Sequence, residues 1–239
     1  MNVKILFEDK DIIVVVKPSG MPSQGDKSMT MDMVSYLKNY LAAAGGQRRQ
    51  QGEPYVGVVH RLDRPVGGVM VYAKTPEAAK QLSRQIQENK VKKKYMALLT
   101  GLLPQKEGHL VNWLLKDGRT NTSSIVPEKT AGAKCAELLY KVIRTRYVDG
   151  MQYSLVQIEL LTGRHHQIRV QTAGAGAGIY GDTKYNPEFQ GKKGWFDMGL
   201  FSCFLGFYHP RTKKQLIFEA LPEAACFKLA EAVKSAEEK

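Results

Sequence analysis

The residues best suited to chemistry lie in the segment 60–64, whose sequence is His-Arg-Leu-Asp-Arg and which precedes a turn rich in proline and glycine. Apolar, strand-like residues flank this segment at 56–59 and 69–72. A carboxylate in such a partly buried setting must be paired or protonated, because an isolated buried charge is costly. Two interpretations follow for Asp63, which Arg61 and Arg64 flank: a structural ion pair at a strand end, or a charged carboxylate presented to a substrate.

A second cluster of polar residues occupies 161–169, which follows a strand-like segment, turns at Gly163 and continues with helical character. Arg164 would lie near the start of that helix, where the helix dipole disfavours a cation. A carboxylate partner would explain this position, and Asp63 is the natural candidate because a guanidinium binds a carboxylate in bidentate geometry. Such a pair would keep Asp63 ionised. A purely structural salt bridge is the alternative.

Basic residues are in excess, with 35 Lys+Arg against 23 Asp+Glu and a formal net charge of +12. This balance favours a polyanionic partner such as nucleic acid. The segment Lys92-Lys93-Lys94-Tyr95 combines three cations with an aromatic ring, which suits both phosphate binding and base stacking. A solvated charged face with a core tyrosine is the alternative. The polar, Gly-rich segment 45–52, with Arg48-Arg49, predicts a mobile loop that faces either solvent or RNA.

Several other classes of site are not supported by the residues. His60, His165 and His166 lie near the two clusters, but neighbouring histidines on a helix point in different directions, so we expect no metal site. The sequence lacks a Gly-x-Ser-x-Gly elbow and a Gly-x-x-x-x-Gly-Lys phosphate loop, and we expect no cofactor. Three widely spaced cysteines and the absence of a long apolar run or signal peptide predict a cytoplasmic protein that does not bind membranes.

The patterns that position these residues alternate between strands and single helices. Strands are predicted at 3–7, 12–17, 56–59, 68–73, 93–100, 138–146 and 153–161, the last two joined by a turn at Asp149-Gly150. Helices are predicted at 31–44, with Thr30 as cap and Asp32 in the first turn, at about 76–88 after the cap Thr75, and at 223–239. The polar segment 116–132 predicts a hairpin or loop. The result is an α+β fold on a large mixed or antiparallel sheet.

Together these segments resemble the RluA-type pseudouridine synthases. The motifs that carry the resemblance follow one another along nearly the whole chain, at 16–21, 60–74, 94–95, 161–169, 181–185 and 209–210. The resemblance implies an isomerase that converts specific uridines of ribosomal or transfer RNA to pseudouridine. In that reaction the base is detached from the ribose at nitrogen, rotated and rejoined through carbon, without a cofactor or a metal.

The resemblance also implies a role for each candidate residue. Asp63 is the catalytic carboxylate, which attacks the sugar, attacks the base or takes a proton from the ribose; these routes stay open. Arg164 would pair with Asp63 and hold its charge and position. Tyr95 would stack on the flipped uracil and help to remove its C5 proton. Arg61 would enter the RNA and occupy the space that the flipped base leaves.

Two features depart from the family pattern. His165 stands where threonine is usual, and the segment 171–178 is unusually rich in glycine and alanine. Both should affect substrate contacts or local packing rather than the chemical step. Because the motifs begin almost at residue 1, we expect a single pseudouridine synthase-like catalytic domain over 1–239, with a large mixed, mainly antiparallel sheet flanked by helices and loops. We expect no S4 RNA-binding domain, and a monomer.

Two other functions compete with this interpretation. A non-catalytic RNA-binding protein or RNA chaperone could retain the fold, although binding alone does not require Asp63, Tyr95 and Arg164 together. A hydrolase that uses Asp63 with His60 or His165 would instead release uracil or cleave the RNA. Isomerisation differs from hydrolysis in that it leaves the mass of the RNA unchanged.

Overall fold

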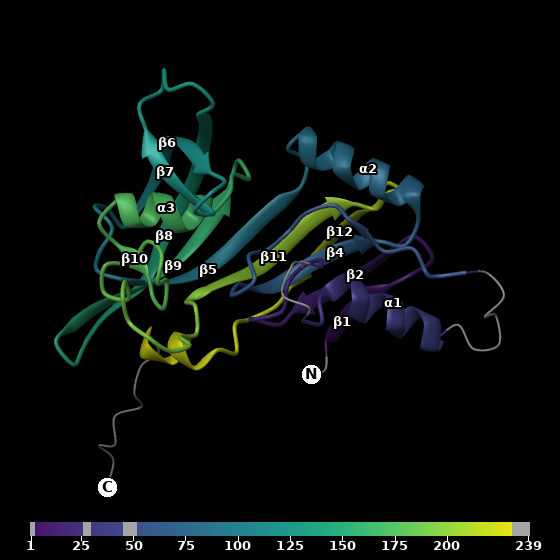
Figure 1. Cartoon of the computed structure of the whole chain (residues 1–239), viewed down its shortest axis with the longest axis horizontal. Coiled ribbons are helices and arrows are strands. Elements are labelled where there is room, and N and C mark those ends of the chain that lie inside the picture. Colours follow the sequence, from purple (N-terminus) through teal and green to yellow (C-terminus); the bar gives the residue numbers. More distant parts are fainter. Residues whose placement is uncertain (1–2, 26–29, 45–51, 231–239) are drawn as a thin grey trace, which may run out of the picture. The chain divides into compact units, whose positions relative to one another are not determined.

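The computed structural model describes residues 3–25, 30–44 and 52–230 (Figure 1). The chain divides into two compact units, which are described one at a time. The first unit comprises Met1–Tyr95 and Phe201–Pro222, and the second comprises Met96–Leu200 and Glu223–Lys239. The segment 45–51, including the Arg48-Arg49 pair of the predicted loop, lies outside the described residues.

A mixed sheet forms the centre of the first unit. Its strands are β1 (Lys4–Glu8), β2 (Ile12–Lys17), β3 (Gly57–Val58), β4 (Gly67–Ala73), β11 (Leu200–Tyr208) and β12 (Gln215–Glu219), together with the first residues of β5 (Lys92–Thr100). The order is β1-β2-β4-β11, with β3 on β4 and β12 on β11. The β4–β11 pair is parallel, whereas β1–β2, β2–β4, β3–β4 and β11–β12 are antiparallel.

Two helices belong to the first unit, α1 (Met33–Ala44) and α2 (Pro76–Gln87). The predicted cap of α2 is confirmed, because the Thr75 side chain accepts a hydrogen bond from the Ala78 amide. The predicted cap of α1 is wrong: the Asp32 carboxylate accepts the Val34 amide at 2.9 Å, and the helix begins two residues later than expected. Leu82 of α2 packs into an apolar cluster formed mainly by β2, β4 and β11.

Gly68 determines how closely β4 and β11 approach each other. It has a φ of +130°, and a Cβ at this position would lie 2.4 Å from the Ser202 carbonyl oxygen and 2.5 Å from the Ser202 nitrogen. Any larger residue would therefore push the two parallel strands apart. The glycine of the first motif thus places Ser202 beside the segment that follows Asp63.

The second unit contains the rest of β5 and an antiparallel series of strands. These are β6 (Glu107–Asp117), β7 (Thr122–Val126), β8 (Lys134–Val148), β9 (Met151–Leu160) and β10 (Gly178–Ile179), with the helix α3 (Gln167–Gly174) and the 3-10 helix η2 (Ala225–Ala230). The order is β5-β9-β8-β6-β7, with β10 on β5. The predicted turn at Asp149-Gly150 is confirmed, and both residues have positive φ, as a two-residue hairpin of this kind requires.

The predicted α+β class with a large mixed, mainly antiparallel sheet is confirmed. The predicted hairpin within 116–132 corresponds to β6 and β7, whose strands pair in antiparallel register. The predicted closing helix is a short 3-10 helix where it is described, and 231–239 lie outside the described residues. None of the described helices combines the length and the apolar character that crossing a membrane would require.

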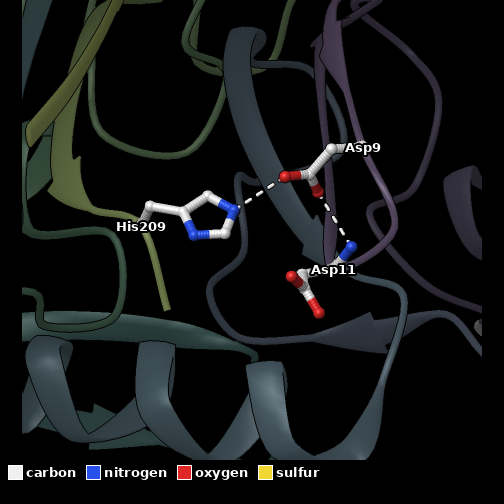
Figure 2. A group of neighbouring side chains, drawn as sticks. All are labelled: Asp9, Asp11 and His209. Atoms are coloured by element: carbon white, nitrogen blue, oxygen red, sulfur yellow. Dashed lines mark hydrogen bonds and ion pairs between the residues drawn. The ribbon is translucent and has the colours of Figure 1, made fainter. Parts of the chain in front are cut away.

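A polar cluster joins the turn between β1 and β2 to the segment after β11, about 200 residues away in sequence (Figure 2). The Arg211 guanidinium binds both carboxylate oxygens of Asp11, with its Nε 2.7 Å from Oδ2. The His209 Nδ1 accepts the amides of Arg211 and Thr212, so its Nε2 carries the proton that is donated to Asp9 Oδ2 at 2.8 Å. The first hairpin is thereby fixed to the end of β11.

Substitution of Asp11 by Asn should lower the free energy of unfolding at neutral pH by about 1–3 kcal/mol, because it breaks a buried carboxylate–guanidinium pair. The hydrogen bonds from Arg211 lower the pKa of Asp11 below its ordinary value of 3.8. The stabilisation is therefore complete above that pH and is lost as the pH falls through the lower folded-state pKa. Urea unfolding from about pH 7 to about pH 2 should show the wild-type protein and the variant converging at the acid end.

The matched control is Asp149→Asn, at an exposed turn position with a φ of 50° that asparagine also adopts readily. This variant should unfold with the same pH dependence as the wild-type protein. A constant difference between wild type and Asp11→Asn over the whole pH range would contradict the assigned ion pair.

Candidate active site

Asp63 lies in the loop between β3 and β4 and is half-buried. Its carbonyl accepts the Val66 amide at 2.9 Å, which closes a tight turn immediately before the glycines of β4. Its negative charge raises the pKa of both Lys17 and Tyr95, which places the three side chains in one electrostatic neighbourhood within the first unit. The structure therefore surrounds Asp63 with a cation and a phenol from two other strands.

Lys17, the last residue of β2, has no exposed surface. Its Nζ donates to the carbonyls of Met21 at 2.7 Å, Pro18 at 3.0 Å and Arg64 at 3.2 Å. Burial lowers the pKa of Lys17 to about 7, and the charge of Asp63 opposes that shift. Three acceptors match the three N–H groups of an ammonium, so the site is built for the charged form. Lys17 thus joins the segment after β2 to the residue that follows Asp63.

Ser23 binds the residue on the other side of Asp63. Its hydroxyl accepts the Leu62 amide at 3.1 Å and donates to the Leu62 carbonyl at 2.8 Å, and all of these groups are buried. The Ser23 carbonyl is fixed in turn by the Tyr72 hydroxyl at 2.9 Å. The backbone on both sides of Asp63 is therefore held by the segment 17–23 that follows β2.

The two arginines beside Asp63 have different environments. The Arg64 side chain donates to the Gly20 carbonyl at 3.0 Å, and the Gly20 amide donates back to the Arg64 carbonyl at 2.9 Å. Arg64 is therefore a structural residue. Arg61 is exposed, and no ion pair or hydrogen bond involves its side chain within the described parts of the chain. The guanidinium of Arg61 is thus available to an external anion.

Tyr95 on β5 is 7 % exposed. Burial raises the pKa of Tyr95, and the negative charge of Asp63 raises it further. The phenol is hydrogen-bonded to the Ser202 side chain, whose hydroxyl also lies 3.3 Å from the Val69 carbonyl. The ring is therefore a neutral, fixed group beside the carboxylate. Its expected role in base stacking stays a prediction.

The ring of His60, the first residue of the motif, is hydrogen-bonded to the backbone of β4. Its Nε2 accepts the Val71 amide at 3.1 Å. Burial lowers the pKa of His60 to about 3, and Lys93 lowers it further, so the imidazole is neutral at physiological pH. A ring nitrogen that already accepts a backbone amide is poorly placed to take a proton from water. This geometry disfavours a hydrolase that relies on His60.

Arg164 belongs to the second unit and lies in the turn before α3. Its Nε donates to the Cys135 carbonyl at 2.8 Å, and its amide donates to the Gln167 side chain at 2.9 Å. Gln167 also binds Thr162 and the Glu137 carbonyl, so the whole turn is anchored to β8. The expected pair between Arg164 and Asp63 stays a prediction.

His165, which replaces the usual threonine, connects the turn before α3 to the β6–β7 hairpin. Its Nδ1 lies 2.8 Å from the Ser123 hydroxyl and its Nε2 lies 3.1 Å from Asn121 Oδ1. The ring also stacks on His166, with centroids 3.7 Å apart. A threonine side chain is too short to make these contacts. The departure from the family pattern therefore fixes a hairpin next to Arg164.

A buried ion pair supports the same region of the second unit. Arg169 on α3 binds both oxygens of Asp182 at 2.8 Å, and the two side chains are 5 % and 0 % exposed. The guanidinium carbon lies 5.1 Å from the centre of the Tyr185 ring. The Tyr185 hydroxyl in turn contacts His166 and the Ser123 amide, both at 2.7 Å. The segment 181–185, to which the sequence assigned no chemistry, is thus a structural support for α3.

Asp9, Asp11 and His209 place possible metal ligands within 4.8 Å of one another. The Arg211 guanidinium already occupies both oxygens of Asp11, and backbone amides occupy His209 Nδ1, so this donor set fits an ion-pair cluster better than a metal site. A Gly-x-Gly-x-x-Gly pattern also occurs at 176–181, although the sequence predicted no cofactor. It follows a helix and runs through β10, whereas a dinucleotide site needs it between a strand and a helix.

Lys17, Ser23 and Ser202 are site residues that the sequence analysis did not identify as such. A lysine at the end of the apolar run Ile-Ile-Val-Val-Val was the available signal for Lys17, because a strand buried on both faces has no solvent for its last side chain. Ser23 and Ser202 gave no local signal. Their roles depend on contacts with Leu62 and Val69 that span 39 and 133 residues.

Comparison with known proteins gives consistent matches. The family model described as RNA pseudouridylate synthase matches residues 11–174. YlyB of Bacillus subtilis, an uncharacterised RNA pseudouridine synthase, is 34% identical over 93% of this chain and 70% of that protein. Ribosomal large subunit pseudouridine synthase C of Buchnera aphidicola is 32% identical over 89% of this chain and 65% of that protein. The tRNA pseudouridine synthase C of Haemophilus ducreyi is 29% identical, over 92% and 91% of the two chains.

A solved structure supports the fold. The human RNA pseudouridylate synthase domain containing 4 superposes with a TM-score of 0.73 over 92% of this chain and 89% of that chain, at 24% sequence identity. At this identity the comparison concerns the fold alone. It agrees with the α+β architecture described above.

Substitution of Ser23 by Ala should free the loop that carries Asp63. The Leu62 amide loses its acceptor while it stays buried, which should lower the free energy of unfolding by about 1–3 kcal/mol. Amide hydrogen exchange should show faster exchange at Leu62 than in the wild-type protein. Ser19→Ala is the comparison, because its hydroxyl donates to the Pro65 carbonyl at an exposed position. Equal effects of the two substitutions on Leu62 exchange would contradict the assigned role of Ser23.

Substitution of His165 by Thr should loosen the turn of the β6–β7 hairpin. The hydrogen bonds to Asn121 and Ser123 are lost, each worth about 1 kcal/mol, so amides of 118–123 should exchange several-fold faster. His109→Thr is the control, because His109 lies on β6 of the same hairpin and pairs instead with Glu137 at 3.3 Å. Unchanged exchange in the turn of the His165 variant would show that this ring does not hold the hairpin.

Proposed function

Because this chain belongs to the RNA pseudouridylate synthase family, whose members are isomerases, we propose that it converts specific uridines of RNA to pseudouridine with Asp63 as the catalytic carboxylate. The family resemblance seen in the sequence is thereby confirmed. The proposal for Asp63 rests on one observation above the others. Asp63 is half-buried in a turn whose two sides are fixed by Lys17 and Ser23, and its charge acts on Lys17 and Tyr95.

The chemistry of the reaction suits this environment. Cleavage of the bond between uracil and ribose, followed by rejoining through carbon, needs one ionised carboxylate but no second acid to activate water. Lys17 supplies a buried amino group that responds to the charge of Asp63, which raises the pKa of Lys17 against the effect of burial. The neutral phenol of Tyr95 adds an aromatic surface for the uracil and no competing charge. Asp63 thus acts on the nucleoside while the surrounding residues hold its charge.

Arg164 and Arg61 complete the proposed site. As the family resemblance implies, Arg164 is the proposed partner of Asp63, and its contact with the Cys135 carbonyl uses only Nε of the guanidinium. Arg61, exposed and without an ion pair among the described residues, enters the RNA where the target base has left the stack. The whole chain acts as one catalytic domain and as a monomer in the cytoplasm, where its three cysteines stay unpaired.

The RNA substrate is ribosomal or transfer RNA. One relative is named for the large ribosomal subunit and another for tRNA, and the tRNA enzyme matches this chain over 91% of its own length. The net charge of +12 supplies the long-range attraction to either polyanion. Mapping of pseudouridine in total RNA from cells with and without this protein separates the two substrates, since the missing sites fall in one RNA class or in both.

Replacement of Asp63 by Asn should slow tritium release from RNA that carries uridine labelled at C5 by about 1000-fold or more. Losses of this size are typical when a catalytic side chain is removed. Asp149→Asn, an acid-to-amide change at an exposed turn, should release tritium at the wild-type rate. Binding of the same RNA by the Asp63 variant, measured by fluorescence anisotropy, should change little, because the substitution removes no phosphate contact.

Three outcomes would overturn the proposal. An RNA chaperone predicts that Asp63→Asn keeps full biological activity, whereas neutralising the basic surface removes it. A hydrolase predicts free uracil or shortened RNA, which mass spectrometry detects at once because isomerisation leaves the mass unchanged. An Asp63→Asn protein that releases tritium at the wild-type rate would show that another group carries out the chemistry.

A further inference from the structure

The segment between Asn186 and Met198 forms a loop of the second unit whose base is fixed and whose tip is exposed. Residues 190–195, with the sequence Gln-Gly-Lys-Lys-Gly-Trp, are all exposed, and Trp195 is 67 % exposed. An indole of this exposure is unusual for a tryptophan, which is highly buried on average. The proposed catalytic residues lie elsewhere in the sequence, so the reaction mechanism leaves this side chain unexplained.

The base of the loop is anchored by hydrogen bonds to buried groups. The Asn186 side chain donates to the Thr100 hydroxyl and to the Ile179 carbonyl, both at 2.8 Å. The Asn186 amide donates to the Asp182 carbonyl at 3.1 Å, which ties the loop to the support of α3. The Gln190 side chain donates to the Lys184 carbonyl at 2.9 Å. These hydrogen bonds fix the backbone at the start of the loop.

Aromatic packing fixes the loop on both sides of its tip. Phe189 is 5 % exposed and packs edge-on against Tyr180 and Phe196, with centroids 4.8 and 5.2 Å away. Phe196 turns toward this cluster, and its neighbour Trp195 remains in solvent. One of two adjacent aromatic residues therefore anchors the loop, and the other is presented outward.

The tip is also basic. Lys192 and Lys193 are exposed, and Lys192 Nζ lies 5.1 Å from the centre of the Phe189 ring. The exposed acidic residues Glu188 and Asp197 flank the tip, and residues 190–195 themselves contain two cations and no anion. An exposed indole beside two lysines is the combination that binds single-stranded RNA, because the cations neutralise phosphates while the ring stacks on a base.

We propose that Trp195, Lys192 and Lys193 form a second contact surface for RNA, in which the indole stacks on an unpaired base of the substrate outside the catalytic site. The inference rests on the proposed function, since it assigns part of the binding of the same RNA. The loop recognises single-stranded character and no particular sequence, because every base has a face for stacking. Substrates that contain an unpaired segment therefore bind more tightly than fully paired ones.

The test uses the full chain with Trp113→Phe, which leaves Trp195 as the only one of the two tryptophans. Titration with oligouridylate should quench the indole fluorescence as the base stacks, and a duplex RNA of equal length should quench it less. Trp195→Ala should weaken oligouridylate binding about 5- to 150-fold by anisotropy, since stacking is worth about 1–3 kcal/mol per base. Trp195→Phe should recover most of the affinity, because a phenyl ring also offers a face on which a base can stack.

Two controls separate stacking from general effects. Tyr147→Ala removes an aromatic ring that is 70 % exposed in the β8–β9 hairpin, and it should leave the affinity unchanged. Lys192→Ala with Lys193→Ala should reduce the magnitude of the slope of log affinity against log salt by about 1.4, the value for two neutralised phosphates on a single strand.

The outcomes distinguish this proposal from the proposed function. RNA that binds without quenching, or equal quenching by duplex RNA, would overturn the stacking surface while tritium release stays intact. An equal loss of affinity in the Trp195 and Tyr147 variants would overturn it as well. Absence of tritium release by the wild-type protein would instead refute the proposed function, and the fluorescence titration would still decide whether Trp195 contacts RNA.

Discussion

The hydrogen bonds of the buried Lys17 amino group to three carbonyls are the interaction on which the arrangement of the first unit depends. A lysine with no exposed surface is unfavourable unless acceptors and a negative charge replace water, and here three carbonyls and the charge of Asp63 do so. Each acceptor lies on a segment that must keep its conformation for the cation to be satisfied. The loop that carries Asp63 and the loop that follows β2 therefore determine each other's conformation.

This dependence also explains the glycines of the first motif. The strand β4 starts immediately after the Asp63 turn and must accept β11 at a distance that only Gly68 allows. That close approach brings Ser202 to Tyr95, so the phenol and the carboxylate lie in one neighbourhood although 32 residues separate them in sequence. Three separate contacts, from Lys17, Ser23 and Ser202, converge on the backbone of this motif and fix its conformation.

Local signals were sufficient for much of the fold. Strand β2 and helix α2 appear where the apolar run and the Thr-Pro-Glu start predict them, and the Asp149-Gly150 turn follows from two residues that tolerate positive φ. Asp63 and Arg164 were identifiable from charge in an apolar setting. What sequence could not supply was pairing over long separations: Ser23 with Leu62, Asp11 with Arg211, and β11 with β4. The predicted cap of α1 was wrong for a local reason. Threonine and aspartate are both good helix caps, and only the hydrogen bond from the Val34 amide identifies Asp32 as the cap.

The histidines give a physical argument for isomerisation over hydrolysis. Each of the five has a ring nitrogen engaged: His60 with the Val71 amide, His109 with Glu137, His165 with Asn121 and Ser123, His166 with Tyr185, and His209 with Asp9. The two histidines considered as partners of Asp63 in a hydrolase have no free acceptor nitrogen for water, because His60 Nε2 accepts the Val71 amide and both ring nitrogens of His165 are engaged. Isomerisation needs no activated water, because the base itself is the group that rejoins the ribose. The histidines stabilise the fold, and Asp63, whose charge acts on Lys17 and Tyr95, is the group proposed to act on the nucleoside.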